Sequence, residues 1–84
     1  MILRITEARV IRPHALFLRF SDGVEGEVEV LPLLIGPIFE PLRDPIFFRL
    51  AELDPICGTV VWPNGADFAP EALRQRIRER VTAG

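Results

Sequence analysis

The chain has 84 residues, 49% hydrophobic and 26% charged, a balance typical of a folded protein and not of a disordered segment. This length suits one domain, which we assign to residues 1–84. A formal net charge of −2 argues against bulk attraction to nucleic acid or to an anionic membrane. Cys57 is the only cysteine, so no internal disulfide forms. Because the N-terminus carries charge from Arg4 onward and no apolar run approaches roughly 20 residues, we expect a cytoplasmic protein with no membrane span.

The first third of the chain alternates with the period of β-strands and predicts an antiparallel meander. In the first strand, 5–11, Thr6, Ala8 and Val10 alternate with the charged residues Glu7 and Arg9. The second and third strands, 15–20 and 24–30, are joined by a three-residue loop that ends in Gly23. The third strand turns Glu25, Glu27 and Glu29 toward solvent.

Both faces of this hairpin predict one register. Its buried face pairs Phe20 with Val24, Leu18 with Gly26 and Leu16 with Val28. On the solvent face the same register sets Arg19 against Glu25, an opposite-charge pair. Gly26 leaves room there for an aromatic ring from elsewhere in the core.

The segment 31–42 is apolar but interrupted by prolines, and we expect irregular cover over the sheet. Asp44 and Pro45 then have the residue types of an N-cap and a first helical position, which predicts a short helix over 45–51. A fourth strand is expected over 58–62, ending at Trp62, the only tryptophan.

Beyond that strand, Pro63 has no N–H to donate and ends the hydrogen-bond ladder of the sheet, and Asn64-Gly65 is suited to a turn. Asp67 has the residue type of an N-cap, and Pro70 is suited to the first turn of a helix over 70–81. Leu73, Ile77 and Val81 form its apolar stripe, flanked by arginines. The fold class is therefore α+β: a small antiparallel sheet, with a three-stranded N-terminal meander and a fourth strand, packed by short helices and a C-terminal helix.

The inventory of reactive residues is poor. Ser21, His14 and Cys57 are each the only residue of their type, and there is no tyrosine. Ser21 and His14 lie in expected turns, and Cys57 resembles a small buried residue. One histidine and one thiol make no structural zinc site. We therefore assign no catalytic residue, no metal ligand and no cofactor.

Two features remain open for binding. The Trp62-Asn64 corner with Asp67 presents an aromatic ring to a partner if that ring is exposed, although burial in a core short of large side chains is the stronger interpretation. Arg74 and Arg78 flank the stripe of the last helix, where a solvated helix face is the stronger interpretation. The candidate interaction surface is Trp62, Asn64, Asp67, Arg74 and Arg78.

A series of sequence blocks carries a resemblance to a known family. The blocks are Phe20-Ser21-Asp22-Gly23, Pro32-Leu33-Leu34, Phe39-Glu40-Pro41-Leu42-Arg43-Asp44-Pro45, Trp62-Pro63-Asn64-Gly65-Ala66-Asp67 and Pro70-Glu71-Ala72-Leu73. Their order and spacing resemble bacterial domain-of-unknown-function family number 2442, from about Val10 to Leu73. Arg74 stands where such families often carry a tyrosine.

The resemblance implies a small α+β domain and a genomic setting, but no activity. Relatives occur as stand-alone proteins or beside helix-turn-helix segments, and some are suspected partners in toxin–antitoxin-like pairs. We expect a non-enzymatic protein-interaction or regulatory domain, antitoxin-like in its finer form, with a protein partner. One alternative is an enzyme or small-ligand binder using Asp, Glu and Arg, and another is a dimeric DNA-binding regulator. A homodimer is a further option, because small sheets expose pairing edges.

Overall fold

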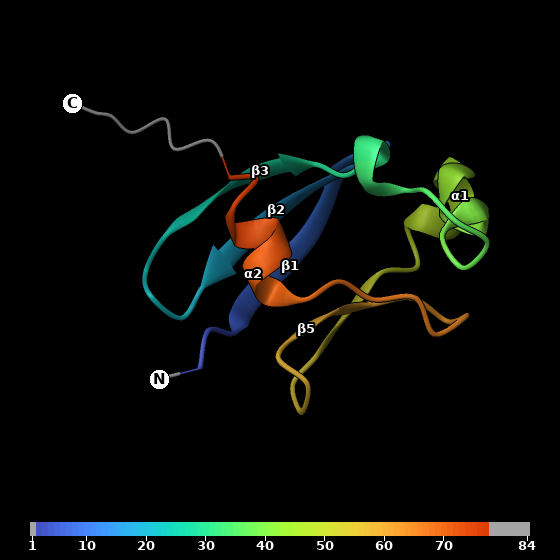
Figure 1. Ribbon diagram of the computed structural model, residues 1–84. Coiled ribbons are helices and arrows are strands. Elements are labelled where there is room, and N and C mark those ends of the chain that lie inside the picture. The colour runs from blue at the N-terminus through green and yellow to red at the C-terminus, as the bar shows by residue number, and fades with distance from the viewer. Residues whose placement is uncertain (1, 78–84) are drawn as a thin grey trace.

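The computed structural model describes residues 2–77 and contains the predicted meander. Strands β1 (Ile5–Arg12), β2 (Ala15–Phe20) and β3 (Glu25–Glu29) form an antiparallel sheet in the order β1-β2-β3 (Figure 1). The predicted register is confirmed, with Leu18 opposite Gly26 and Arg19 opposite Glu25. The backbone N–H of Phe20 donates to the carbonyl of Val24 over 2.8 Å. Local alternation therefore determines this part of the fold.

The first strand departs from strict alternation. The pairing of β1 with β2 shifts between Ile5 and Glu7, and again between Val10 and Arg12. A bulge changes the face to which the following side chains point. As a result Ile5 is buried in the core while Thr6, predicted to share a face with Ala8 and Val10, is exposed.

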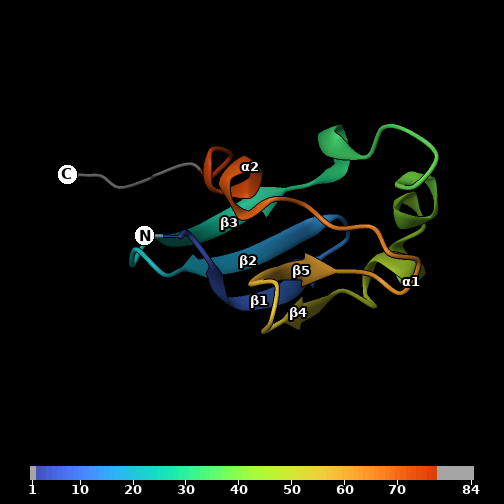
Figure 2. The same cartoon turned by 60° about the horizontal axis from the view of Figure 1, so that its bottom comes forward.

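The fourth predicted strand is present, but its partner was not predicted. Strand β5 (Thr59–Val61) pairs with β4 (Glu52–Asp54) in a separate two-stranded antiparallel sheet. This hairpin packs against β1, and the amide N–H of Ile5 donates to the carbonyl of Gly58 over 2.8 Å (Figure 2). The β4 segment is too short to display a period, which is why the sequence pattern did not reveal it.

The helices are shorter than predicted. The segment 31–43 contains two 3-10 helices, η1 (Leu31–Leu33) and η2 (Glu40–Arg43), and α1 (Pro45–Phe48) follows. Asp44 caps α1 as predicted, accepting a hydrogen bond from the amide N–H of Ile46 over 3.0 Å. Helix α2 (Pro70–Arg74) is capped by Ala69 without a side-chain bond, so the prediction of Asp67 as its N-cap is wrong. The predicted extension of this helix to Val81 reaches beyond the described residues.

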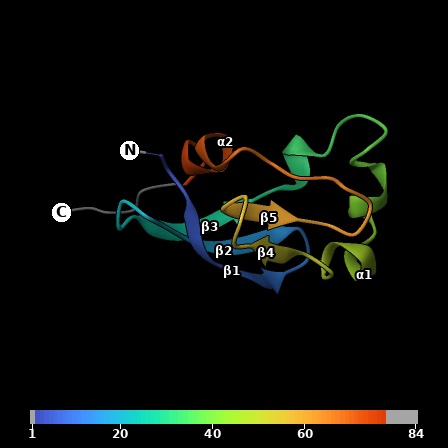
Figure 3. The same ribbon diagram turned by 90° about the horizontal axis from the view of Figure 1, so that it is seen from below.

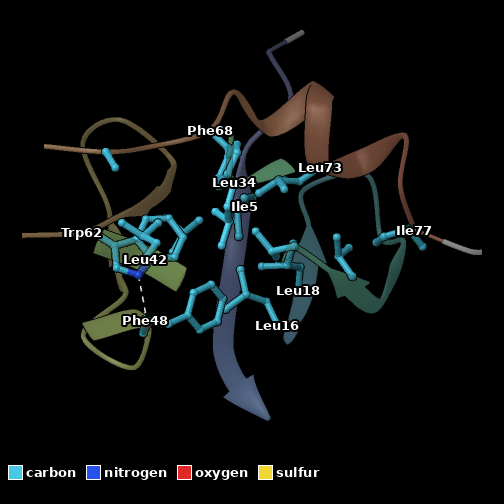
Figure 4. Close-up of a cluster of buried hydrophobic side chains, with 14 of the residues drawn as sticks. Ile5, Leu16, Leu18, Leu34, Leu42, Phe48, Trp62, Phe68, Leu73 and Ile77 are labelled. Carbon is cyan, nitrogen blue, oxygen red and sulfur yellow. Dashed lines mark hydrogen bonds between the residues drawn. The ribbon is translucent and has the colours of Figure 1, made fainter. Parts of the chain in front are cut away.

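The core lies between the meander, α2 and the aromatic residues beside α1 (Figure 4). Leu73 and Ile77 lie at one end of this core, and Phe48 and Trp62 lie at the other. The space beside Gly26 is taken by Ile77, whose Cγ2 would lie 3.1 Å from a Cβ at that position. The predicted occupant, an aromatic ring, was therefore wrong. Seen from below, α1 and the 31–43 segment gather at the end of the meander where the β1–β2 turn lies (Figure 3). The α+β fold class is confirmed.

Candidate interaction surface

Trp62 belongs to the core and not to the surface. Its side chain is 2% exposed, and its Nε1–H donates to the carbonyl of Phe48 over 2.9 Å. The indole packs at 5.4 Å from the Phe48 ring and meets Phe68 edge-on at 5.9 Å. The interpretation of Trp62 as a buried anchor is confirmed, and its ring is not presented to a partner.

Asn64 and Asp67 shape the chain around this anchor. Asn64 Nδ2 donates to the carbonyl of Ile38 over 2.9 Å, while its Oδ1 accepts from the amide N–H of Ala66. Asp67 forms an isolated backbone bridge with Val61, which continues β5 toward α2. Both side chains are exposed, but these contacts give the two residues structural roles in the fold.

Arg74 is half-buried and paired. Its Nε lies 3.1 Å from Oδ2 of Asp22 in the β2–β3 loop, so it connects α2 to the tip of the hairpin. The pKa of the Asp22 carboxyl is lowered, first by the hydrogen bond from the Val24 amide and then by Arg74. Arg78, the fifth predicted surface residue, lies outside the described residues. The described candidates therefore do not assemble into one exposed site.

His14, in the β1–β2 turn, connects the end of the meander to the segment just before α1. Its Nε2 lies 2.8 Å from the carbonyl of Arg43 and 3.1 Å from that of Leu42. Because both partners are acceptors, Nε2 carries the proton in this contact. The residue has a φ of 63°, a left-handed conformation that histidine adopts more often than most residues. This role fits the turn position predicted from the sequence.

The other candidates for chemistry are also accounted for. The Ser21 hydroxyl accepts a hydrogen bond from the amide N–H of Arg4. Cys57 is exposed in the β4–β5 turn, so its predicted burial is wrong. The neighbouring Asp54 carboxylate, with a smaller contribution from Asp67, raises the pKa of the Cys57 thiol. A raised pKa leaves less of the nucleophilic thiolate.

The carboxylates occupy separate turns and a charged face. Asp22, Asp44 and Asp54 each accept a backbone N–H two residues ahead. On the solvent face of the meander, ion pairs link Glu7 with Arg9 and Arg19, Glu25 with Arg19, and Glu27 and Glu29 with Arg12. Within residues 2–77 no cluster of His, Cys, Asp and Glu is suited to hold a metal ion.

An apolar groove lies between the end of β1 and α1. Its volume is about 330 Å³. Its lining consists mostly of apolar side chains with two arginines: Val10, Ile11, Arg12, Pro13, Pro45, Ile46 and Arg49. Ile46 is 70% exposed and Ile11 38% exposed, so this apolar surface is open to solvent. We call it the β1–α1 groove.

Sequence reasoning missed this groove because its two walls are far apart in the chain. One signal was present: every residue of the predicted helix 45–51 except Arg49 is apolar. Phe48 is buried, while Ile46 and Leu50, four residues apart, are exposed. A short helix with apolar side chains on its outer face has more apolar surface than its own core contact uses.

Comparison with known proteins places the chain in a family without assigning an activity. The model of the family described as a protein of unknown function, DUF2442, matches residues 5–79. No curated protein and no solved structure matches the chain. Along residues 2–77, no helix is long and apolar enough to cross a membrane.

Proposed function

Since the chain belongs to the DUF2442 family of proteins of unknown function, we propose its role from its own residues: a non-enzymatic protein-interaction domain. The reactive side chains of the described chain support this role. His14 and Ser21 lie in turns, where their side chains form hydrogen bonds with backbone groups of distant segments, and the pKa of Cys57 is raised. The His14 imidazole contacts backbone carbonyls, and the carboxylate beside Cys57, that of Asp54, raises the pKa of the thiol, so neither contact activates a nucleophile.

The observation that carries the proposal is the open β1–α1 groove. Single exposed apolar residues are normal on a protein surface, and Ile35 and Ile56, 76% and 86% exposed, need no partner to explain them. The groove differs because apolar side chains from two distant segments line one concavity. Contiguous apolar surface with a polar rim is typical of protein-binding sites.

The finer form of the proposal is an antitoxin-like regulator. Neutralising another protein requires a binding surface and no chemistry, which fits the side chains described above. In this form the partner is the product of a neighbouring gene. Co-expression of the two genes is then expected to restore growth that the partner alone inhibits.

The proposal is tested on the chain tagged at its own locus and kept at its native level. Size-exclusion chromatography and native mass spectrometry of the purified material are expected to show a stoichiometric complex with one other protein. A chain that elutes alone at native concentration contradicts the interaction role. Turnover of a small molecule by the isolated chain contradicts its non-enzymatic character.

A further inference from the structure

We propose that the β1–α1 groove binds a short acidic segment of a protein partner, seating one bulky apolar side chain beside a carboxylate. This inference rests on the interaction role above and adds to it the location of the site and the chemistry of the ligand. It follows from three properties of the groove: its lining, its rigidity and its charge.

The lining is suited to one apolar side chain. Pro13 on the β1 side and Pro45 on the α1 side present rings without an N–H, and Ile46 adds an aliphatic side chain. A volume of about 330 Å³ lies at the lower end of the range for small-molecule pockets. The groove therefore accommodates a side chain with its flanking backbone rather than a folded domain.

The two walls are held in place before any ligand arrives. His14, directly after Pro13, bonds to the carbonyls of Leu42 and Arg43 just before α1. The other end of α1 is fixed by the indole N–H of Trp62, which donates to Phe48 (Figure 4). A preformed site loses less conformational entropy on binding, so a small contact area suffices.

The charge selects an acidic ligand. Arg12 and Arg49 lie at the groove, and no acidic side chain belongs to its lining. Arg12 already pairs with Glu27 and Glu29 across the sheet. Arg49 forms no ion pair within the described part of the chain, so its guanidinium has donors free for a carboxylate. A guanidinium binds a carboxylate through two parallel hydrogen bonds, which adds direction to the apolar contact.

A fluorescent reporter, Trp62, lies in the core next to α1 and outside the groove lining. Trp62 is the only tryptophan, the chain has no tyrosine, and the indole is bonded to the last residue of α1. A ligand that contacts α1 is expected to change the fluorescence of this indole. Binding is therefore measurable on the unlabelled chain.

The experiment titrates the full chain with three blocked peptides that differ only in charge and apolarity: Asp-Leu-Phe-Asp, Lys-Leu-Phe-Lys and Asp-Ser-Ser-Asp. Trp62 fluorescence and calorimetry follow binding. The acidic apolar peptide is expected to bind, and the other two at least about tenfold more weakly, because each lacks one of the two contacts. Equal binding of all three peptides, or of none, overturns the proposal.

Variants then locate the site. Arg49→Glu is expected to weaken the acidic apolar peptide by about tenfold or more and to gain binding of Lys-Leu-Phe-Lys. The matched control is Arg43→Glu, an exposed arginine outside the groove lining, which is expected to leave both affinities unchanged. If Arg49→Glu loses the acidic peptide without gaining the basic one, or if Arg43→Glu loses the acidic peptide equally, Arg49 does not contact a carboxylate of the ligand.

A second pair of variants tests the apolar contact. Ile46→Asp is expected to abolish peptide binding. Ile35→Asp, at a residue of similar exposure (76% against 70%) outside the groove lining, is expected to leave binding unchanged. Sedimentation of the wild-type chain completes the test. A dimer that Ile46→Asp dissociates would show that a second copy occupies the groove and would overturn the peptide proposal. If the native partner still binds the Arg49→Glu and Ile46→Asp variants, the groove is not its binding site, while the proposed interaction role is retained.

Discussion

The two halves of this small domain are held together in different ways. In the β2–β3 hairpin of the meander, apolar residues alternate with charged ones, and the cross-strand pairs keep one register. In the segment 31–68, order depends on a few side chains that reach distant backbone groups. Trp62 bonds to Phe48, Asn64 to Ile38, and His14 reaches over from the β1–β2 turn.

This difference affects how each half tolerates substitution. A repeated pattern distributes stability over many weak contacts, so the loss of one exposed pair changes little. A single buried hydrogen bond to a carbonyl has no substitute, and its loss leaves an unpaired polar group. We therefore expect the second half to be the more sensitive one, and the predictions below test this contrast.

The largest effect is expected at Trp62. Trp62→Ala removes the indole from the core and should lower the free energy of unfolding by about 3–5 kcal/mol. A domain of this length has only about 4–12 kcal/mol in total. Trp62→Phe, which keeps a ring but leaves the Phe48 carbonyl without its donor, should cost about 1–3 kcal/mol from that group alone. Urea denaturation measures both variants, and a Phe variant as stable as wild type would show that the hydrogen bond contributes nothing.

The meander has one sensitive position of its own, Gly26. A valine there must displace Ile77, because even a Cβ at this position would lie only 3.1 Å from Ile77 Cγ2. Overpacking of this kind costs about 1–3 kcal/mol. Glu27→Val, one residue along on the solvent face of the same strand, is the control for the general effect of valine in β3. Thermal melts in which both variants behave alike would contradict close packing at Gly26.

A smaller effect is expected at His14. His14→Ala removes the donor shared by the carbonyls of Leu42 and Arg43 and should cost about 0.5–1.5 kcal/mol. His14→Gly loses the same bond but suits the left-handed backbone better, so it should be the more stable of the two variants. Equal stability of the Ala and Gly variants would show that the positive φ is not a source of strain.

The same contrast explains which features were predictable from the sequence. The hairpin from Leu16 to Val28 was predicted in detail because strand alternation is a local property. The cap at Asp44 was also predictable, since a proline follows it at once. Asp67 was misassigned because aspartate suits loops as well as caps, and only tertiary structure shows its bridge to Val61.

The remaining errors arise from contacts between distant segments. The Ile77 side chain packs beside Gly26, and the carbonyl of Gly58 accepts a hydrogen bond from the amide N–H of Ile5. Neither contact produces a periodic pattern in the sequence. The candidate surface was composed of single unusual residues such as Trp62, for which burial, the stronger interpretation, is confirmed. The β1–α1 groove is formed by Pro13 and Ile46, which no local pattern connects.

The smallest effect is expected at Asp22, where the hairpin tip meets α2. Its carboxyl has a pKa below the ordinary value of 3.8, so it stabilises the fold above that value and loses this contribution as the pH falls through the lowered pKa. Asp22→Asn retains an acceptor for the Val24 amide but removes the charge that pairs with Arg74. Wild type should therefore be slightly more stable than the variant at neutral pH, and the difference should shrink as the pH falls through the lowered pKa of Asp22. Urea denaturation across this range measures it. Because the side chains of Arg74 and Asp22 are still 30% and 41% exposed, added salt should reduce the difference as well. A gap that persists in acid would mean that the asparagine disturbs the loop itself.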